Sequence, residues 1–200
     1  MATVTGAWFR GWSDSTSVTR GQVLAVVDNL TSMWVSLPAG ASRYTILDAA
    51  GRRSASGAFA YAFPQRLPPG GRAYLVDMID ASFSDLATLV EVTVEPVFGS
   101  SEPVADLVTV TDIMWQGADG GGLTASGRVN NPGAVEIRDV VVAIVFLDAA
   151  GDPLSVVYDP EPSSLGPDAS RAFTTAYPNT GPVDPTDVFL VRPIAGPYKP

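Results

Sequence analysis

The pentapeptide LDAAG occurs at Leu47–Gly51 and again, unchanged, at Leu147–Gly151, in a chain of 200 residues. Each copy follows a run of apolar residues that ends in leucine. An aspartate whose side chain accepts from backbone amides, followed by a glycine that tolerates positive φ, is typical of a β-turn. Both copies are therefore predicted to be the end of a core strand and the turn of a β-hairpin.

Other segments on either side of the pentapeptide also occur twice and in the same order. A repeat of this length indicates two homologous domains. We assign them to residues 1–100 and 104–197, with a Gly-, Ser- and Pro-containing junction between them. The matching segments are VTGAW (4–8) with VTDIMW (110–115), LAVVDN (24–29) with ASGRVN (125–130), LPPGGRAY (67–74) with LGPDASRAF (165–173), and VEPV (94–97) with VRPI (191–194).

The pattern within each repeat is that of short strands. Val and Thr alternate in VEVTVEPV (90–97) and DLVTVTDIMW (106–115), which suits a pleated surface buried on one face. Turn residues recur every several positions. The fold class is therefore predicted to be all-β, with two tandem immunoglobulin-like or fibronectin type III-like antiparallel β-sandwiches.

At this point the residues resemble a known family. YTILD (Tyr44–Asp48) and IVFLD (Ile144–Asp148), each followed by small residues and glycine, resemble the F-x-L-Y-D signature of the bacterial FxLYD domain. VDN with LPPG in the first repeat, and VNN with LGPD in the second, match its upstream V-x-N and downstream L-x-P-G. Leucine replaces the signature tyrosine in both copies, which leaves the LEA-type water-stress domain as an alternative. The resemblance implies a sandwich repeat of unknown molecular function in exported or lipid-anchored bacterial surface proteins, and it implies no catalytic residues.

Composition narrows the possible functions. The chain has no cysteine and no histidine, and its single lysine is Lys199. Thiol nucleophiles, histidine bases and lysine Schiff bases are thereby excluded or improbable, so we predict no enzymatic activity and no cofactor. The net charge of −9 argues against nucleic acid and anionic membranes as partners. Residues 101–200 hold thirteen of the 21 acidic side chains and five of the 12 basic ones, so the acidity lies in the second repeat.

The longest apolar run, Val140–Leu147, is far shorter than the ~20 residues of a transmembrane helix. No signal peptide is recognisable in the first residues. Together with the family resemblance, this predicts a secreted or envelope-attached protein whose export signal is absent from this chain.

Four acidic residues of the second repeat are candidate calcium ligands. Asp148, Asp152, Asp159 and Glu161 flank its predicted hairpin and offer the hard oxygen ligands that calcium prefers. Their spacing lacks the D-x-D-x-D-G pattern of calcium loops. The favoured interpretation is that they are solvated turn residues, so no metal site is predicted.

The run VVVAIVFL (140–147) is apolar at consecutive positions, whereas a strand with one wet face alternates. If Ile144 and Phe146 face the core, Val141, Val145 and Leu147 point outward. Their cover would come from the other domain, a second chain or a ligand, or from a loop or edge of the same domain. These three residues form part of a predicted interaction patch.

The four tryptophans fall into two groups, according to whether the other repeat has a counterpart. Trp8 and Trp115 occupy matching segments and are predicted to lie in the core. Trp12 and Trp34 have no counterpart in the second repeat, so they complete the interaction patch as candidate platforms for a sugar ring or a protein partner.

The sequence thus predicts a non-enzymatic interaction or adhesion-type module of the bacterial surface, with a protein or glycan partner and an undefined oligomeric state. A structural spacer of a surface lipoprotein is the main alternative. A carbohydrate-binding module and a carboxylate-dependent hydrolase are less favoured, because no pair of carboxylates stands out among the acids.

Overall fold

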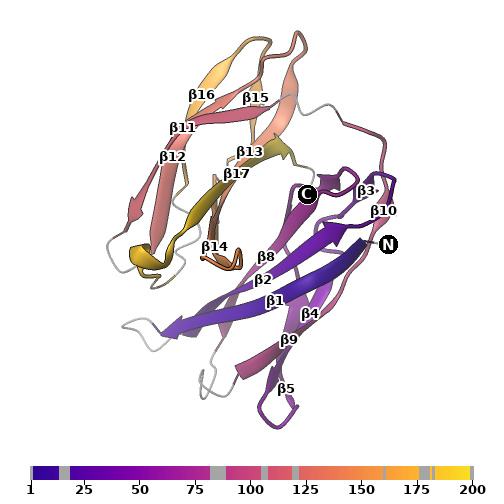
Figure 1. Cartoon of the computed structure of the whole chain (residues 1–200), viewed down its shortest axis with the longest axis vertical. Helices are drawn as coiled ribbons and strands as arrows, with labels where there is room; N and C mark the ends of the chain where they lie inside the picture. The colour runs from indigo at the N-terminus through magenta and orange to yellow at the C-terminus, as the bar shows by residue number, and fades with distance from the viewer. Residues whose placement is uncertain are drawn as a thin grey trace. The chain divides into compact units, whose positions relative to one another are not determined.

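The computed structural model describes residues 2–13, 19–81, 89–104, 108–118, 122–159, 161–175, 181 and 183–198. The chain divides into two compact units, residues 1–104 (unit 1) and 105–199 (unit 2). Every strand pair in the described part is antiparallel, and the one helix described there is the single 3-10 turn η2 (Pro185–Asp187) (Figure 1). The prediction of an all-β protein with antiparallel sheets is confirmed. Within the described ranges, no helix has the length and apolar character needed to span a bilayer.

Unit 1 is built from three antiparallel sheets. The largest has the order β1-β2-β8-β6, the second β5-β4-β9, and a small third sheet has the order β10-β3-β7. The strands are β1 (Ala2–Ser13), β2 (Thr19–Asn29), β3 (Val35–Ser36), β4 (Arg43–Asp48), β5 (Arg53–Ala58), β6 (Tyr61–Phe63), β7 (Arg66–Leu67), β8 (Arg72–Ala81), β9 (Leu89–Glu95) and β10 (Gly99–Ser100).

The core of unit 1 lies between its two larger sheets. Val23, Ala25 and Val27 of β2 and Leu75 of β8 meet Ile46 of β4 in one buried cluster. These β2 positions alternate along the strand, as expected for one face of a pleated sheet. Burial of such side chains is the main favourable contribution to folding, at about 25 cal/mol per Å² of apolar surface.

Unit 2 contains two sheets. One has the order β11-β12-β16; in the other, β13 is central, with β14 and β15 on successive parts of one side and β17 as a further partner. Its core joins Val129 and Phe173 of the first sheet to Ile144 and Phe146 of the second. The strands are β11 (Thr109–Gly117), β12 (Leu123–Asn130), β13 (Ile137–Leu147), β14 (Pro153–Tyr158), β15 (Ser163–Leu165), β16 (Ser170–Thr175) and β17 (Leu190–Pro197).

The strand connectivity of unit 1 recurs in unit 2. The pairing β1-β2-β8 corresponds in chain order to β11-β12-β16, and β5-β4-β9 corresponds to β14-β13-β17. In each unit the LDAAG segment joins the central strand of the second sheet to its hairpin partner. The repeated sequence thus accompanies a repeated topology.

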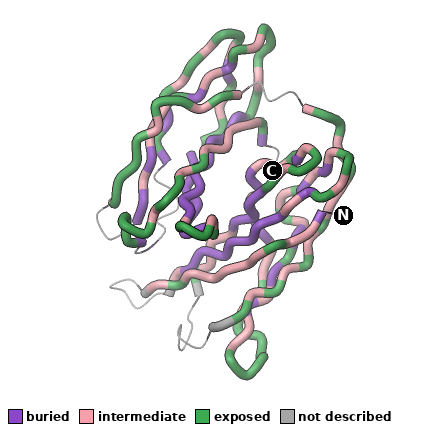
Figure 2. Tube along the Cα trace, viewed as in Figure 1, coloured by how far each residue is buried: buried purple, intermediate pink, exposed green. Residues whose placement is uncertain are grey.

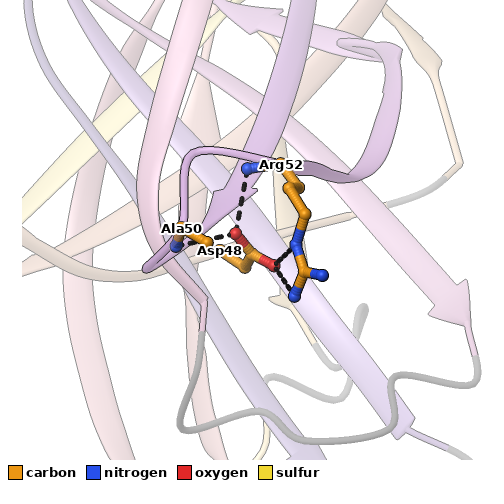
Figure 3. Close-up of polar contacts among 3 residues, drawn as sticks. All are labelled: Asp48, Ala50 and Arg52. Atoms are coloured by element: carbon orange, nitrogen blue, oxygen red, sulfur yellow. Dashed lines mark hydrogen bonds and ion pairs between the residues drawn. The ribbon is translucent and has the colours of Figure 1, made fainter.

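The two LDAAG turns have the same internal hydrogen bonds. Asp48 accepts through Oδ1 from the backbone amides of Ala50 and Arg52, both at 2.9 Å (Figure 3). Asp148 accepts from the corresponding amides, Ala150 and Asp152, at the same distances. The glycines Gly51 and Gly151 have φ of 74° and 86°, values that glycine adopts without strain. The predicted roles of aspartate and glycine in these turns are confirmed.

The two turns differ in one interaction. In unit 1 the Arg52 guanidinium lies 2.8 Å from Asp48 Oδ2 (Figure 3). Unit 2 has Asp152 at the equivalent position, so no such pair forms. Hydrogen bonds from the Arg52 and Ala50 amides, which favour the charged carboxylate, lower the pKa of Asp48.

β17 is the last strand of unit 2 and contains two prolines. Pro193 lies opposite Ile144 and Pro197 opposite Val140 in the register with β13. Proline has no amide hydrogen, so it fits only at ladder positions that do not donate to the neighbouring strand. Both prolines therefore occupy positions whose missing donors belong to the side of β17 that faces away from β13.

Candidate functional site

A buried asparagine in each unit closes one end of the first sheet. Asn29, at the end of β2, donates through Nδ2 to the carbonyls of Met33 at 2.8 Å, Leu67 at 3.3 Å and Pro68 at 2.9 Å. Its Oδ1 accepts from the amide and the hydroxyl of Thr31. The side chain is fully buried, and it joins the strand end to the turn that precedes β8.

Asn131 makes the corresponding bonds in unit 2. Its Nδ2 donates to the carbonyls of Val135 at 2.8 Å, Leu165 at 3.0 Å and Gly166 at 2.9 Å, and its Oδ1 accepts from the Gly133 amide. The V-x-N and L-x-P-G elements quoted from the sequence are thus in direct contact in both units. Because its Nδ2 contacts three carbonyls within the fold, Asn29 has a structural role.

These bonds correct the alignment of the repeats by one residue. Asn29 corresponds to Asn131, whereas matching LAVVDN with ASGRVN pairs it with Asn130. Counting back from the asparagines, Leu24 corresponds to Ser126, and their partners in the register are Trp8 and Met114. In strands, a slip of one residue moves every side chain to the opposite face.

The prediction that Trp8 and Trp115 are equivalent core residues is therefore wrong. Trp8 is half-buried and absent from the core cluster of unit 1, whereas its neighbour Phe9 packs on that cluster. Trp115 corresponds to Phe9, and its ring meets Phe146 edge-to-face at 5.7 Å, yet 36% of it is exposed. Each first strand contains one bulge, between Val4 and Gly6 in β1 and between Thr111 and Met114 in β11. The two bulges add one residue each, so Trp8 corresponds to Met114 at the same spacing as Val4 to Val110, whereas matching Trp8 with Trp115 assumes one extra residue in the second repeat.

The three valine and leucine positions of the predicted patch lie on one face of β13. Val140, Val142, Ile144 and Phe146 belong to the core cluster of unit 2, whereas the alternating residues do not. Those alternating residues are nonetheless buried: Val141 is 5%, Val145 0% and Leu147 2% exposed. β13 is thus apolar and buried on both faces, and we call the face with Val141, Val145 and Leu147 the second face of unit 2.

Unit 1 has a second face as well, on its largest sheet, and the sequence analysis missed it. Leu24 and Val26 of β2 and Tyr74 and Val76 of β8 alternate with core residues. Each is at most 4% exposed, and none belongs to the core cluster of the unit. Figure 2 shows the buried stretches of the chain in purple. The signal was the apolar run from Ala73 to Val76, which has the same form as the run in β13.

Aromatic side chains extend this second face. Tyr61 and Phe63 of β6 stack with their ring centres 5.7 Å apart and an interplanar angle of 10°. Trp8 and Trp12 fall on the same face of β1 by alternation, and Trp12 lies opposite Arg20 in the register. Trp12 and Trp34, the two tryptophans predicted for the interaction patch, are both half-buried. Trp34 precedes β3, where its carbonyl accepts from the Ser101 amide at 3.2 Å.

The calcium candidates are engaged in separate interactions. Asp148 shapes its own turn, and Asp152 is exposed beside it. Asp159 is buried, where it pairs with Arg171 Nη1 at 2.9 Å and accepts from the Glu161 amide at 3.1 Å. Across the described ranges, no three acidic side chains come together as a metal-binding group.

The carboxyl with the greatest chemical interest is Asp77. It lies in β8 and accepts from the Tyr44 hydroxyl of β4 at 2.6 Å, so the pair joins the two larger sheets of unit 1. Burial raises the pKa of Asp77, and the Tyr44 hydrogen bond and the backbone amides of Met78 and Ala60 oppose that rise. Burial, together with the carboxylate, also raises the pKa of Tyr44. With its partners inside the fold, Asp77 is suited to a structural role.

The raised pKa of Asp77 has a consequence for stability. A carboxyl whose pKa is higher in the folded state than its ordinary 3.8 binds its proton more tightly when folded. Its contribution to stability therefore falls as the pH rises from 3.8 through the raised value. We expect Asp77→Asn to unfold at a higher urea concentration than the natural chain at pH 7, with a difference that shrinks toward pH 4.

The matched control is Asp80→Asn on the same strand, whose exposed carboxylate lies 3.3 Å from Arg20. Such surface pairs contribute little, so this variant should unfold close to the natural chain at both pH values. A difference for Asp77→Asn that is equally large at pH 4 and pH 7 would contradict the assignment.

Removal of two buried hydroxyls in unit 2 is expected to change the free energy of unfolding in opposite directions. The Ser155 hydroxyl is fully buried and has no hydrogen-bond partner, so we expect Ser155→Ala to raise the free energy of unfolding by about 0.5–1 kcal/mol. The Thr175 hydroxyl donates to the Ala125 carbonyl and accepts from its amide, both at 3.1 Å. Thr175→Val should therefore lower that free energy by about 1–3 kcal/mol. Urea unfolding followed by circular dichroism measures both, and a loss of stability in Ser155→Ala would overturn the first.

Comparison with known proteins yields little. No family model matches the chain, and no curated protein matches it. A weak match among solved structures is a point mutant of oxalate decarboxylase from Bacillus subtilis, with 12% sequence identity and a TM-score of 0.14. That match covers 88% of this chain and 76% of the other.

Proposed function

We propose that the chain is a non-enzymatic interaction module of the bacterial surface, formed by two immunoglobulin-like β-sandwich domains similar to FxLYD domains. The observation that carries the proposal is that Trp12 and Trp34, which have no counterpart in the second repeat, are only half-buried. Tryptophan combines a large apolar ring with a polar N–H and is enriched where proteins bind partners. The second faces of the two units, with Val145 and Tyr74, are buried in the structure and are not part of the proposed contact surface.

The domain assignment is supported by the repeated strand order and by the repeated asparagine. Two sheets that enclose one core, with hairpins between sequential strands, agree with an immunoglobulin-like topology. The contact between V-x-N and L-x-P-G gives a physical reason for these two elements of the FxLYD signature to occur together.

We propose no enzymatic activity because of the types of residue that the chain contains. A hydrolase without histidine or cysteine would use carboxylates at a defined separation. Asp77 is the carboxyl in the described part whose pKa is raised, and its oxygens are engaged by Tyr44 and backbone amides. This arrangement favours a binding or structural role over catalysis.

The ligand is proposed to be a protein or glycan at the cell surface, with Trp12 and Trp34 in its contact surface. The purified chain should be tested against a bacterial glycan array and immobilised ectodomains of envelope proteins. We expect one class to be retained, with affinity reduced about tenfold by Trp12→Ala or Trp34→Ala, as for an aromatic anchor at an interface.

Met114→Ala, an exposed apolar position on β11, is the matched control and should leave the affinity unchanged. Retention that neither tryptophan variant alters would move the contact surface elsewhere. A complete lack of retention on both arrays would remove the binding proposal and favour a spacer that holds another component away from the membrane.

A further inference from the structure

We propose that the turn Asn29–Trp34 of unit 1 contacts the surface of a zwitterionic lipid bilayer, with Leu30 and Met33 inserted among the headgroups. Leu30 is 69% and Met33 70% exposed, three residues apart in one short turn. Trp34 is half-buried at its base. We call Leu30 and Met33 the apolar tip.

The apolar tip is held by the fold. Asn29 Nδ2 donates to the Met33 carbonyl, and the Thr31 hydroxyl, whose one hydrogen is shared with Asn29 Oδ1, lies 2.9 Å from the same carbonyl. The Met33 amide donates back to the Thr31 hydroxyl at 3.2 Å. Little backbone freedom remains to be lost when the two side chains enter another phase, which favours insertion.

The turn forms without leucine and methionine at the tip positions. Unit 2 has the same turn after Asn131, with the same bond from Nδ2 to the carbonyl of Val135. There the sequence is NPGAVE, which exposes Val135 but continues into Glu136 and Arg138, whose side chains are 3.4 Å apart. Charged residues therefore follow the turn of unit 2 directly, whereas apolar residues follow the turn of unit 1.

The lack of charged residues around the apolar tip indicates the kind of surface that it contacts. From Asn29 to Ser42 the chain contains no charged residue. Asp28, which precedes the turn, is neutralised by Arg72 through two bonds of 2.7 and 2.9 Å. β3 pairs with β7 and with β10. The charged residues in these two strands and just after them are Arg66 in β7 and Glu102 after β10.

An uncharged tip on a chain of net charge −9 disfavours both anionic lipid and a basic partner at this point. Apolar side chains with a tryptophan beside them suit the interfacial region of a neutral bilayer. This inference shares Trp34 with the contact surface proposed for a protein or glycan partner, but it rests on Leu30 and Met33 and is tested on these two residues.

The test is flotation of the full chain with vesicles of pure phosphatidylcholine. We expect a measurable fraction of the chain to float with the vesicles, and the double variant Leu30→Ser with Met33→Ser to reduce it about tenfold, as removal of two inserted apolar side chains predicts. Leu30→Trp, which enlarges the inserted surface, should increase it. Addition of phosphatidylserine should lower binding of the natural chain.

Val135→Ser is the matched control, because Val135 is 69% exposed in the equivalent turn. It should float as the natural chain does. The inference is overturned if the natural chain does not float, as expected if the tip occupies a protein pocket instead. It is also overturned if the double variant floats undiminished, or if Val135→Ser and the double variant lose binding equally.

Discussion

Asn131→Asp is expected to lower the free energy of unfolding by about 3–5 kcal/mol at pH 7, enough to unfold unit 2 in a chain of ordinary stability. The substitution keeps the shape of the side chain but replaces the Nδ2 donor with an oxygen. That oxygen faces the carbonyls of Val135, Leu165 and Gly166, which lie 2.8–3.0 Å from Nδ2. The two N–H donors that serve these three carbonyls are then lost, and the charge of the buried carboxylate is placed beside three carbonyl oxygens.

The measurement is urea unfolding by circular dichroism at pH 7 and pH 4. The introduced carboxyl is destabilised in its charged form, so its pKa in the folded state is raised and part of the lost stability returns as the pH falls. Asn130→Asp is the matched control, because this neighbouring residue points to the other face and unit 1 has Asp28 at the equivalent position. It should cost less than about 1 kcal/mol, as other surface substitutions do. Equal effects of the two variants would show that the asparagine contacts do not stabilise the unit.

Val145→Asp should lower the free energy of unfolding by about 3 kcal/mol or more, because Val145 is fully buried on the second face and the new carboxylate has no partner there. The equivalent residue of unit 1 is Thr45, which pairs with Ser56 and Thr93 on a half-exposed face of β4. Thr45→Asp should cost less than about 1 kcal/mol, since its charge can be hydrated.

Urea unfolding of the two variants at pH 7 compares the same strand position in the two repeats. Val145→Thr adds a size-matched step, because it exchanges a methyl for a hydroxyl and should lie between the natural chain and Val145→Asp. If Val145→Asp and Thr45→Asp unfold at the same urea concentration, the second face of unit 2 is accessible to water and its assignment as a buried surface fails.

Local rules account for much of the fold. The Asp and Gly of LDAAG determine a turn by hydrogen bonds and φ angles that involve only neighbouring residues, and these were predictable. The alternation of Val and Thr in β9 likewise identified strands and their antiparallel character.

The errors arose where the outcome depends on distant residues. Which face Trp8 occupies depends on the position of a bulge, and one added residue reverses the answer. The two family elements VDN and VNN carried the correct alignment, because they match Asn29 with Asn131. The Tyr44–Asp77 bond joins residues 33 apart in the sequence, and no local pattern marks such a pair.

In the candidate site, too, some features follow from neighbouring residues and others depend on distant ones. The second face of unit 2 was detectable because β13 has eight consecutive apolar residues, Val140–Leu147. In unit 1 the second face lies on the other sheet, on β2 and β8, where the apolar stretches are shorter and end near polar Gln22 and Asp77. Burial at such positions depends on which sheet faces which, and that is a property of the tertiary structure.

The prolines of β17 bear on how this protein behaves at high concentration. A terminal strand with a full row of free amide donors can recruit the same strand of another molecule, and repetition of that step produces fibrils. Pro193 and Pro197 remove two of those donors at alternate positions along the strand. The outer edge of β17 is therefore poorly suited to pair with a strand of another molecule.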